Sequence, residues 1–289
     1  RAKLEAAGET DIDRKVLQFV PTKEGKSYYQ TEEGDFWRVS VFIPRTQTFN
    51  QVTPQNAYDC GRTFGRFESM LTDVEEKLGE TIPDFHNMEL RIRQLREAVK
   101  ADAAGRLHEV SALVDKIEQH AEAMCRAEKL YREGQLPKRL CHCDTKVNNM
   151  LFDETGQVLC VIDLDTVMPS FVFSDYGDFL RTAANATRED DPDVSKVALR
   201  WDVIESFTKG YIEGTRHFLT DTERDMLPFA MQLFPYMQCV RFLADYINGD
   251  TYYKTTYAAH NLDRAHNQWR LFELTLAGED RLQQFVKTL

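Results

Sequence analysis

The spacing of hydrophobic and polar residues changes along the chain, from a strand-like period to a helical one. Runs of β-branched and aromatic residues at Val16–Val20, Ser27–Gln30 and Phe36–Ile43 are separated by turn residues, which predicts an antiparallel meander. The residues before it, 2–7, are good helix formers and predict the last turns of a helix. Pro44 ends the last run, because proline cannot donate to a strand ladder. The chain therefore begins with a small β-rich part.

From Gln55 onward the apolar spacing becomes helical. Five apolar side chains are predicted to share the face of a first helix: Tyr58, Phe64, Phe67, Met70 and Leu71. Further helical stretches are predicted at 87–132, with a break near Gly105, and at 203–213, 222–248 and 262 to near the end. A larger helical part therefore follows the β-rich part.

The segment from Arg139 to Asp165 interrupts this helical pattern. A short strand-like run, Arg139–His142, is followed by two apolar runs at 150–152 and 159–162. The turn residues 153–157 lie between these two runs, so the sequence predicts a β-hairpin. Strands and helices are thus largely segregated along the chain, as in the α+β class.

Composition and charge exclude several classes of function. The chain has 289 residues, of which 42% are hydrophobic and 29% charged, a normal globular composition. Its formal charge is -11, and no Lys/Arg-rich run forms a basic face, so we expect no nucleic-acid binding. No apolar run is long enough for a membrane span, so we expect no membrane insertion. The six cysteines form neither a disulfide framework nor a zinc spacing, which favours a cytoplasmic protein with reduced thiols.

The string from Leu140 to Asn149 carries the candidate chemistry. Phosphoryl transfer requires a group that orients the attacking hydroxyl and oxygen ligands that hold metal ions on the phosphates. His142 stands two residues before Asp144, and Asn149 stands five residues after it, as in kinase catalytic loops. The hairpin that follows delivers Asp163 beside Asn149, and both offer the hard oxygen ligands that Mg²⁺ prefers. These residues predict a phosphoryl-transfer centre.

Several strings resemble one kinase superfamily. The stretch from Leu140 to Asp178 resembles the aminoglycoside phosphotransferases and choline kinases. The strings at 142–149, 161–169 and 175–178 are more similar to those of the N-acetylhexosamine 1-kinases. The resemblance implies an α+β, protein-kinase-like fold with two lobes. Residues 1–43 would form a partial, truncated β-rich N-terminal lobe, and residues 44–289 a mainly helical C-terminal lobe.

The resemblance also implies a reaction and its cofactors. An N-acetylhexosamine kinase phosphorylates the anomeric hydroxyl of its sugar with ATP and Mg²⁺. In this role Asp144 is the catalytic base and Lys146 offsets charge at the γ-phosphate. The expected metal ligands are Asn149, Asp163 and, with a sugar contact as its alternative role, Asp165. The expected sugar contacts are Asp144, Arg241, Asp245 and Tyr252, and the backbone of Phe42 and Ile43 is expected to contact adenine.

Three further residues near the string have expected supporting roles. Asp178 is expected to open a helix and to accept hydrogen bonds from the catalytic-loop backbone. Asp175 is expected to be a cap or turn residue. His142 is expected to pack against the loop and hold it rather than to react.

Two parts of such a kinase are missing from the sequence. No G-x-G-x-x-G string precedes the catalytic loop, and Lys3, Lys15 and Lys23 are not in the context of the phosphate-binding lysine. We therefore expect that strands carrying these parts precede Arg1 in a longer protein. Two alternatives stay open: a kinase of another small alcohol (an amino alcohol, an aminoglycoside or another sugar), or an inactive pseudokinase that binds a sugar. The sequence predicts no oligomeric state.

Overall fold

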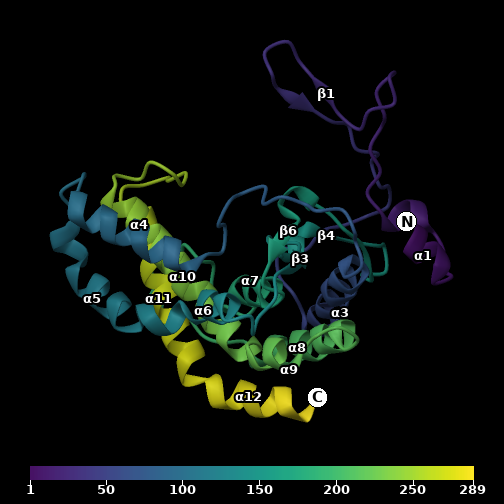
Figure 1. The fold of residues 1–289 in the computed structure, drawn as a ribbon. Coiled ribbons are helices and arrows are strands. Elements are labelled where there is room, and N and C mark those ends of the chain that lie inside the picture. The colour runs from purple at the N-terminus through teal and green to yellow at the C-terminus, as the bar shows by residue number, and fades with distance from the viewer.

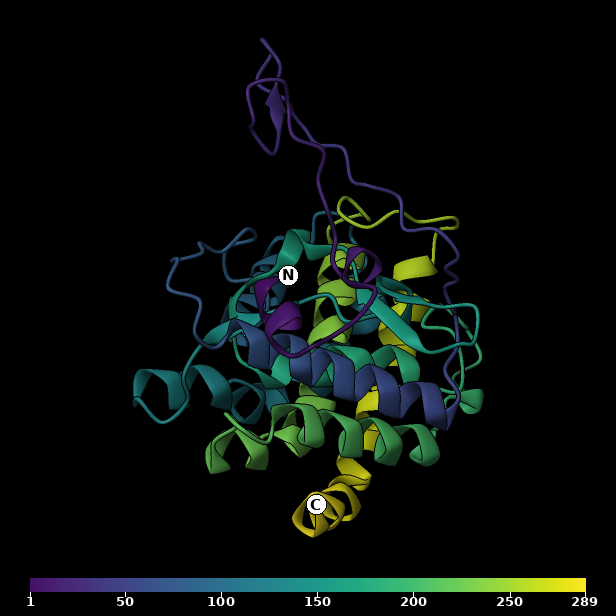
Figure 2. The same cartoon turned by 90° about the vertical axis from the view of Figure 1, so that its right-hand side faces the viewer.

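An extended N-terminal arm and a helical body form the chain in the computed structural model, which describes residues 1–289 (Figure 1). The arm, residues 16–42, projects from the body in both views (Figures 1 and 2). It follows two short helices, α1 (Ala2–Ala6) and α2 (Ile12–Lys15). Lys3 on α1 forms an ion pair with Asp73, just beyond the first long helix of the body. The arm is therefore attached to the body at its N-terminal end as well as at its C-terminal end.

The predicted meander in the arm is mostly wrong. Only β1 (Tyr29–Gln30) and β2 (Phe36–Trp37) pair, in antiparallel register, and a single bridge joins Phe19 to Ser40. The side chains of Phe36, Trp37 and Phe42 are exposed, so no second layer packs on this hairpin. An isolated two-stranded hairpin is marginally stable, because its strands bury too little apolar surface. The residues between these pairs form turns and bends, such as the turn closed by the Gly25 amide on the Thr22 carbonyl oxygen.

The first long helix of the body is α3 (Pro54–Leu71), which packs against α8 (Trp201–Thr215). The hydroxyl of Thr53 caps α3 by accepting a hydrogen bond from the Asn56 amide at 3.2 Å. The buried face of α3 differs from the predicted aromatic face. It contains Ala57, Cys60, Gly61, Phe64, Gly65 and Glu68. A Cβ at Gly61 would lie 2.3 Å from the Phe207 carbonyl oxygen, so the small residues let the two helices approach closely.

The other helices largely follow the predicted pattern. The predicted break near Gly105 is confirmed, and a second break at Cys125 separates two of the helices. The predicted helix at 222–248 is divided at Met226, because Pro228 starts a new helix there. The helices are α4 (Met88–Ala101), α5 (Leu107–Met124), α6 (Arg126–Arg132), α7 (Phe173–Ala183), α9 (Asp221–Asp225), α10 (Leu227–Ile247), α11 (His260–Ala277) and α12 (Glu279–Thr288).

Helix α10 forms the centre of the body. Nearly all of its side chains are buried, and it packs against α4, α7 and α11. Such a helix is apolar on every side because neighbouring helices cover it all around. No helix combines the length and the apolar character that crossing a membrane requires.

The four strands of the body form two small antiparallel pairs. One pair joins β3 (Arg139–Cys141) to β6 (Met168–Ser170), and the other joins β4 (Met150–Phe152) to β5 (Val158–Val161). The β4–β5 pair is the predicted hairpin, which is confirmed. Three short 3₁₀ turns complete the elements: η1 (Val147–Asn149), η2 (Leu164–Thr166) and η3 (Val194–Lys196). The strands lie between α3 and α10 (Figure 1), and the fold is α+β with two lobes, as predicted.

Candidate active site

The catalytic loop, residues 142–149, connects β3 to β4. Two residues near its functional side chains have left-handed backbone conformations, Cys143 with φ 64° and Asp163 with φ 59°. Residues other than glycine adopt this region at a cost, and such positions are common at functional sites. Cys143 directly precedes Asp144. The backbone is therefore strained at the points that aim Asp144 and Asp163.

The carboxylate of Asp144 is held on both oxygens. The ammonium of Lys146 lies 2.6 Å from its Oδ1, and the Asn149 amide donates a hydrogen bond to its Oδ2 at 3.1 Å. The same Asn149 Nδ2 donates to the Asp144 carbonyl oxygen at 2.8 Å. The Asp144 side chain is 25% exposed, so a ligand can reach it. Because Asn149 uses its Nδ2 in the loop, its Oδ1 stays available to a cation.

Asp163 lies next to this loop with a free carboxylate. The Ile162 amide donates a hydrogen bond to the Asn149 carbonyl oxygen at 2.9 Å, which joins the two segments directly before Asp163. The Asp163 side chain is exposed and has no hydrogen bond or ion pair within the chain. The oxygens of Asn149 and Asp163 therefore fit the ligand preference of Mg²⁺.

Asp165 has a different partner from the one predicted. Its carboxylate forms an ion pair with Arg38 of the arm. Arg38 has no signal in the sequence, because it lies near Asp165 only where the arm returns to the body. The role of Asp165 as a metal ligand stays a prediction.

Two buried acids of α7 hold the loop from behind. The carboxylate of Asp175 accepts hydrogen bonds from the amides of His142 and Cys143, each at 2.7 Å. Asp178 accepts one from the Thr145 amide at 3.0 Å. The predicted loop contact of Asp178 is confirmed, but the helix begins at Phe173, so Asp178 does not open it. The prediction that Asp175 is a cap or turn residue is wrong, because its carboxylate binds two loop amides.

Burial changes the protonation of these acids. It raises the pKa of Asp178 to about 6, although the nearby Arg181 guanidinium acts in the opposite direction. Burial also raises the pKa of Asp175, and its hydrogen bonds from two loop amides oppose that rise. Amide donors favour the charged form of a carboxyl group, so Asp175 is well suited to be ionised.

Glu68 is a functional residue that the sequence analysis missed. It lies on α3 with 2% exposure, and its Oε2 accepts a hydrogen bond from the Tyr211 hydroxyl at 2.8 Å. Ligand atoms of Glu68, Cys141 and Asp175 lie within 4.8 Å of one another. Burial raises the pKa of Glu68 well above its usual value, and the charge of Asp175 raises it further. Glu68 is therefore the protonated member of this carboxyl pair.

The signal for Glu68 was present in the sequence. It lies four residues after Phe64, on the face that also carries Ala57 and Gly61. A glutamate on the buried face of a helix needs a partner, and that requirement marks it as a candidate.

His142 supports the loop as predicted. Its Nε2 lies 2.9 Å from the Ile162 carbonyl oxygen, and its Nδ1 accepts a hydrogen bond from the Asp144 amide at 3.3 Å. The ring also packs edge-on against Phe64. The Nε2 atom thus joins the loop to the segment after the hairpin, and the Nδ1 atom holds the loop backbone at Asp144.

A cavity of about 190 Å³ lies beside Asp144, and we call it the acceptor cavity. Its wall includes Arg241 and Tyr253 together with Phe85 and His86. The Arg241 guanidinium lies over the rings of Phe85 and Tyr253, 5.5 Å from each centroid. The structure therefore brings three of the predicted site residues, Asp144, Lys146 and Arg241, to one cavity.

Two other predicted sugar contacts do not line this cavity. Tyr252 is 72% exposed, and its neighbour Tyr253 lines the wall instead. The buried carboxylate of Asp245 accepts hydrogen bonds from five donors: the amides of Thr251, Tyr252 and Tyr253, the Thr251 hydroxyl and the side chain of Asn261. Because its oxygens are used to fold the loop after α10, we correct its role from sugar contact to loop support.

A second cavity of about 360 Å³ contains the predicted adenine-contacting residues, and we call it the hinge cavity. Phe42, Ile43 and Asp163 line it, and Arg38 lies at its edge. The Phe42 amide and carbonyl make no backbone hydrogen bond, so both are available to a ligand. The Phe42 side chain is 83% exposed, whereas Ile43 is buried.

The fold and the site define a kinase-like phosphotransferase with a strained catalytic loop between two lobes. The profile described as the phosphotransferase enzyme family matches residues 14–210, more than half of the chain. The chain belongs to this family. The predicted superfamily is thus confirmed, whereas the N-acetylhexosamine subgroup stays a prediction.

Solved structures share the fold at low sequence identity. An aminoglycoside phosphotransferase from Alicyclobacillus acidocaldarius is 16% identical with a TM-score of 0.64, and the match covers 99% of this chain and 82% of that one. A spectinomycin phosphotransferase in complex with ADP and spectinomycin is 15% identical, with a TM-score of 0.53 and coverages of 96% and 80%. The choline kinase of Streptococcus pneumoniae is 11% identical, with a TM-score of 0.52 and coverages of 94% and 78%.

Proposed function

We propose that this chain transfers the γ-phosphoryl group of ATP to the anomeric hydroxyl of an N-acetylhexosamine in the cytoplasm. One observation supports the proposal: two acids of the site line two different cavities. Asp144 lines the acceptor cavity together with Arg241, and Asp163 lines the hinge cavity. In this proposal the acceptor would bind on one side of the loop and the nucleotide on the other. We keep the division into lobes at residues 1–43 and 44–289 as part of this proposal.

On the nucleotide side, the proposed contacts use groups that have no partner within the chain. The amide and carbonyl of Phe42, with Ile43 beside them, would bind the adenine edge. The Asn149 Oδ1 and the Asp163 carboxylate would hold Mg²⁺, which offsets the negative charge of the phosphates when bound.

On the acceptor side, Asp144 would orient the attacking hydroxyl and accept its proton. Its carboxylate is fixed by Lys146 and Asn149, so it points in one direction before the substrate arrives. Lys146 also adds a positive charge beside the site where the phosphoryl group passes. Phosphoryl transfer requires mainly that the reactants are positioned and that the charge on the transferring group is stabilised, and these groups are suited to both tasks.

The chemistry of the acceptor cavity favours a neutral polar substrate. Only one nitrogen of Arg241 is used within the chain, in a hydrogen bond to the Gln238 side chain at 3.0 Å. The remaining N–H groups can bind the hydroxyls and the acetamido carbonyl of the sugar. A quaternary ammonium would need free aromatic faces, but Arg241 already lies over Phe85 and Tyr253. A choline-like acceptor is therefore disfavoured.

An ADP-release assay with free acceptors tests the proposal. The panel contains GlcNAc, GalNAc, glucose, choline, ethanolamine and an aminoglycoside, with ATP and Mg²⁺. The methyl glycoside of GlcNAc is the matched control, because its anomeric hydroxyl is blocked. We expect ADP release with an N-acetylhexosamine and none with the methyl glycoside. Turnover of choline without turnover of either amino sugar would refute the substrate. Sugar binding without turnover of any acceptor would favour the pseudokinase.

A further inference from the structure

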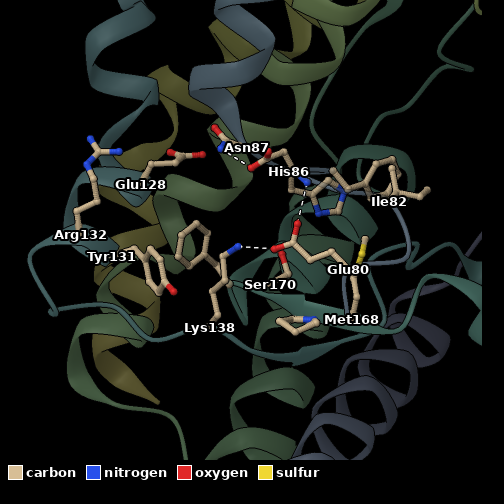
Figure 3. Close-up of a pocket in the computed structure, with 14 residues that line it drawn as sticks. Glu80, Ile82, His86, Asn87, Glu128, Tyr131, Arg132, Lys138, Met168 and Ser170 are labelled. Carbon is tan, nitrogen blue, oxygen red and sulfur yellow. Dashed lines mark hydrogen bonds and ion pairs between the residues drawn. The ribbon is translucent and has the colours of Figure 1, made fainter. Parts of the chain in front are cut away.

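A third cavity, of about 170 Å³, lies next to α6, and we call it the α6 cavity (Figure 3). Residues 80–87 before α4, helix α6 and strand β6 form its walls. Phe85 and His86 line both this cavity and the acceptor cavity, so they separate the two. Asp144 does not line the α6 cavity, and the proposed phosphoryl transfer does not use it. Its chemistry therefore needs a separate explanation.

Glu128 is the group in this cavity that most needs a partner. It lies on α6 with 7% exposure, and its Oε1 accepts a hydrogen bond from the Met88 amide at 2.6 Å. Its Oε2 is buried and has no hydrogen-bond partner. A buried carboxylate oxygen without a donor is costly, because it has lost its water and gained nothing in return. The cavity beside it is where a donor can enter.

The two cations that line the cavity are already paired with other acids. The Lys138 ammonium lies 2.7 Å from Glu80, an ion pair marked by a dashed line in Figure 3. The Arg132 guanidinium donates two hydrogen bonds to Glu89, at 2.9 and 2.7 Å. Neither forms a salt bridge with Glu128, so the cavity keeps an uncompensated acid.

The rest of the wall suits the apolar part of a small ligand. Tyr131 and Phe171 meet edge-on with centroids 6.0 Å apart. The His86 ring also lies here, and burial lowers its pKa to about 3, so the imidazole is neutral and does not repel a cation. The volume is below the roughly 300–1,000 Å³ of sites for drug-sized ligands. A ligand of a few heavy atoms is the size that fits.

We propose that the α6 cavity binds a small organic cation that carries a primary ammonium group. The ammonium donates a hydrogen bond to Glu128 Oε2, and its alkyl part packs against Tyr131 and Phe171. The charge-assisted hydrogen bond gives a donor to the Glu128 oxygen that has no partner within the chain. Burial raises the pKa of Glu128 to about 7 without a ligand, so the carboxyl can ionise near neutral pH when a cation arrives.

Titration of the full chain with n-propylammonium chloride, followed by calorimetry, tests this site. The probe has no hydroxyl, so it cannot be a phosphoryl acceptor, and the result does not depend on the proposed kinase activity. Glu128→Gln keeps the size of the side chain and an acceptor for the Met88 amide, but removes the charge. Glu97→Gln is the matched control, because it removes one exposed negative charge of α4 outside the cavity. Asp144→Asn is the control for binding in the acceptor cavity.

We expect Glu128→Gln to weaken binding by at least about tenfold, which corresponds to the loss of one charge-assisted hydrogen bond. Glu97→Gln and Asp144→Asn should bind the probe within about twofold of the unmodified chain. Unchanged affinity in Glu128→Gln would overturn the proposal, and so would an equal loss in Glu97→Gln. A loss confined to Asp144→Asn would place the cation in the acceptor cavity and also overturn it.

A measurement on the unmodified chain covers the case in which Glu128→Gln does not fold. Selective labelling of tyrosine and phenylalanine allows the ring resonances of Tyr131 and Phe171 to be followed by NMR during the titration. Saturable shifts at these two rings support the site. Shifts only at Tyr253, in the acceptor cavity, would contradict it.

Discussion

The body and the arm hold their charged side chains in opposite ways. In the body, Glu68, Asp175 and Asp178 are all less than 10% exposed, and backbone amides or a phenol bind them. In the arm, Arg38 pairs with Asp165, and the two side chains are 47% and 59% exposed. The buried acids fix the catalytic loop in one arrangement. The exposed pair joins the arm to the body where water can replace either partner.

This difference matches what each region would have to do in a kinase. A buried polar network is strong when it is fully satisfied, because each lost bond leaves an unpaired group. An exposed ion pair contributes only about 0–1 kcal/mol, because water screens it. The catalytic loop must keep its geometry, whereas the hinge cavity must open to admit a nucleotide. The comparison predicts that substitutions in the body have larger effects than those in the arm.

The largest effect is expected at the reacting end of the loop. Asp144→Asn removes the proposed base while its side chain keeps the same shape, so kcat should fall by roughly 10²–10⁴-fold. Sugar affinity, measured by calorimetry, should change little, because Arg241 stays in place. Asp280→Asn is the matched control, because it removes an exposed aspartate of α12 that does not line the cavity. Turnover of Asp144→Asn within threefold of the unmodified enzyme would remove Asp144 from its role.

The next largest effect is expected at Glu68. Glu68→Ala leaves the Tyr211 hydroxyl and the Asp175 carboxylate without their neighbour, which should cost about 1–3 kcal/mol of stability. Because Asp175 holds the catalytic loop, the loss of Glu68 should shift this loop. We expect kcat to fall by roughly 10- to 100-fold, with a smaller change in KM.

Glu68→Gln is the rescue variant for this prediction. Its amide can donate to Asp175 as the protonated carboxyl of Glu68 does, so activity and thermal midpoint should return toward the original values. If the glutamine variant is as impaired as the alanine variant, Glu68 does not act as a donor to Asp175.

A third prediction concerns the pH dependence that burial gives to the body. The folded pKa of Glu128 is about 7, above its usual value of 4.5, so the folded state holds this proton more tightly than the unfolded state. This tighter proton binding stabilises the folded state. The stabilisation is fully present below pH 4.5 and is lost as pH rises through 7, by about 3 kcal/mol in total.

Glu128→Gln has no such proton, which makes it the test. Its stability relative to the unmodified chain, measured by urea unfolding, should therefore rise between pH 5 and pH 8. Glu89→Gln, which removes an acid that is 38% exposed, should show a much flatter difference. A Glu128→Gln difference that does not change with pH would mean that Glu128 is not buried in solution.

The sequence predicted the parts of the site that depend on local spacing. Asp144, Asn149 and Asp163 lie in one loop and one hairpin, so their order along the chain is enough to bring them together. The fold class and most of the helices followed from the apolar period for the same reason.

The sequence did not predict contacts between distant segments. Glu68 reaches the Tyr211 hydroxyl because glycines let α3 approach α8 closely, and it lies beside Asp175 of α7. Tyr253 lines the acceptor cavity instead of Tyr252 because the Asp245 carboxylate folds the loop after α10. The arm was predicted as strands because its residues have β propensity, but no layer covers them. Packing decided these three cases, and a spacing pattern does not contain that information.

The smallest effect is expected where arm and body meet. Arg38→Ala breaks the exposed pair with Asp165, so stability should fall by less than about 1 kcal/mol. Because Arg38 lines the hinge cavity with Asp163, KM for ATP should rise by about two- to fivefold while kcat stays unchanged. Arg96→Ala breaks an equally exposed pair with Glu118 in the body and should change stability as little without changing KM. A loss of stability in Arg38→Ala as large as that in Glu68→Ala would show that the arm is held as firmly as the catalytic loop, and the contrast between the two regions would fail.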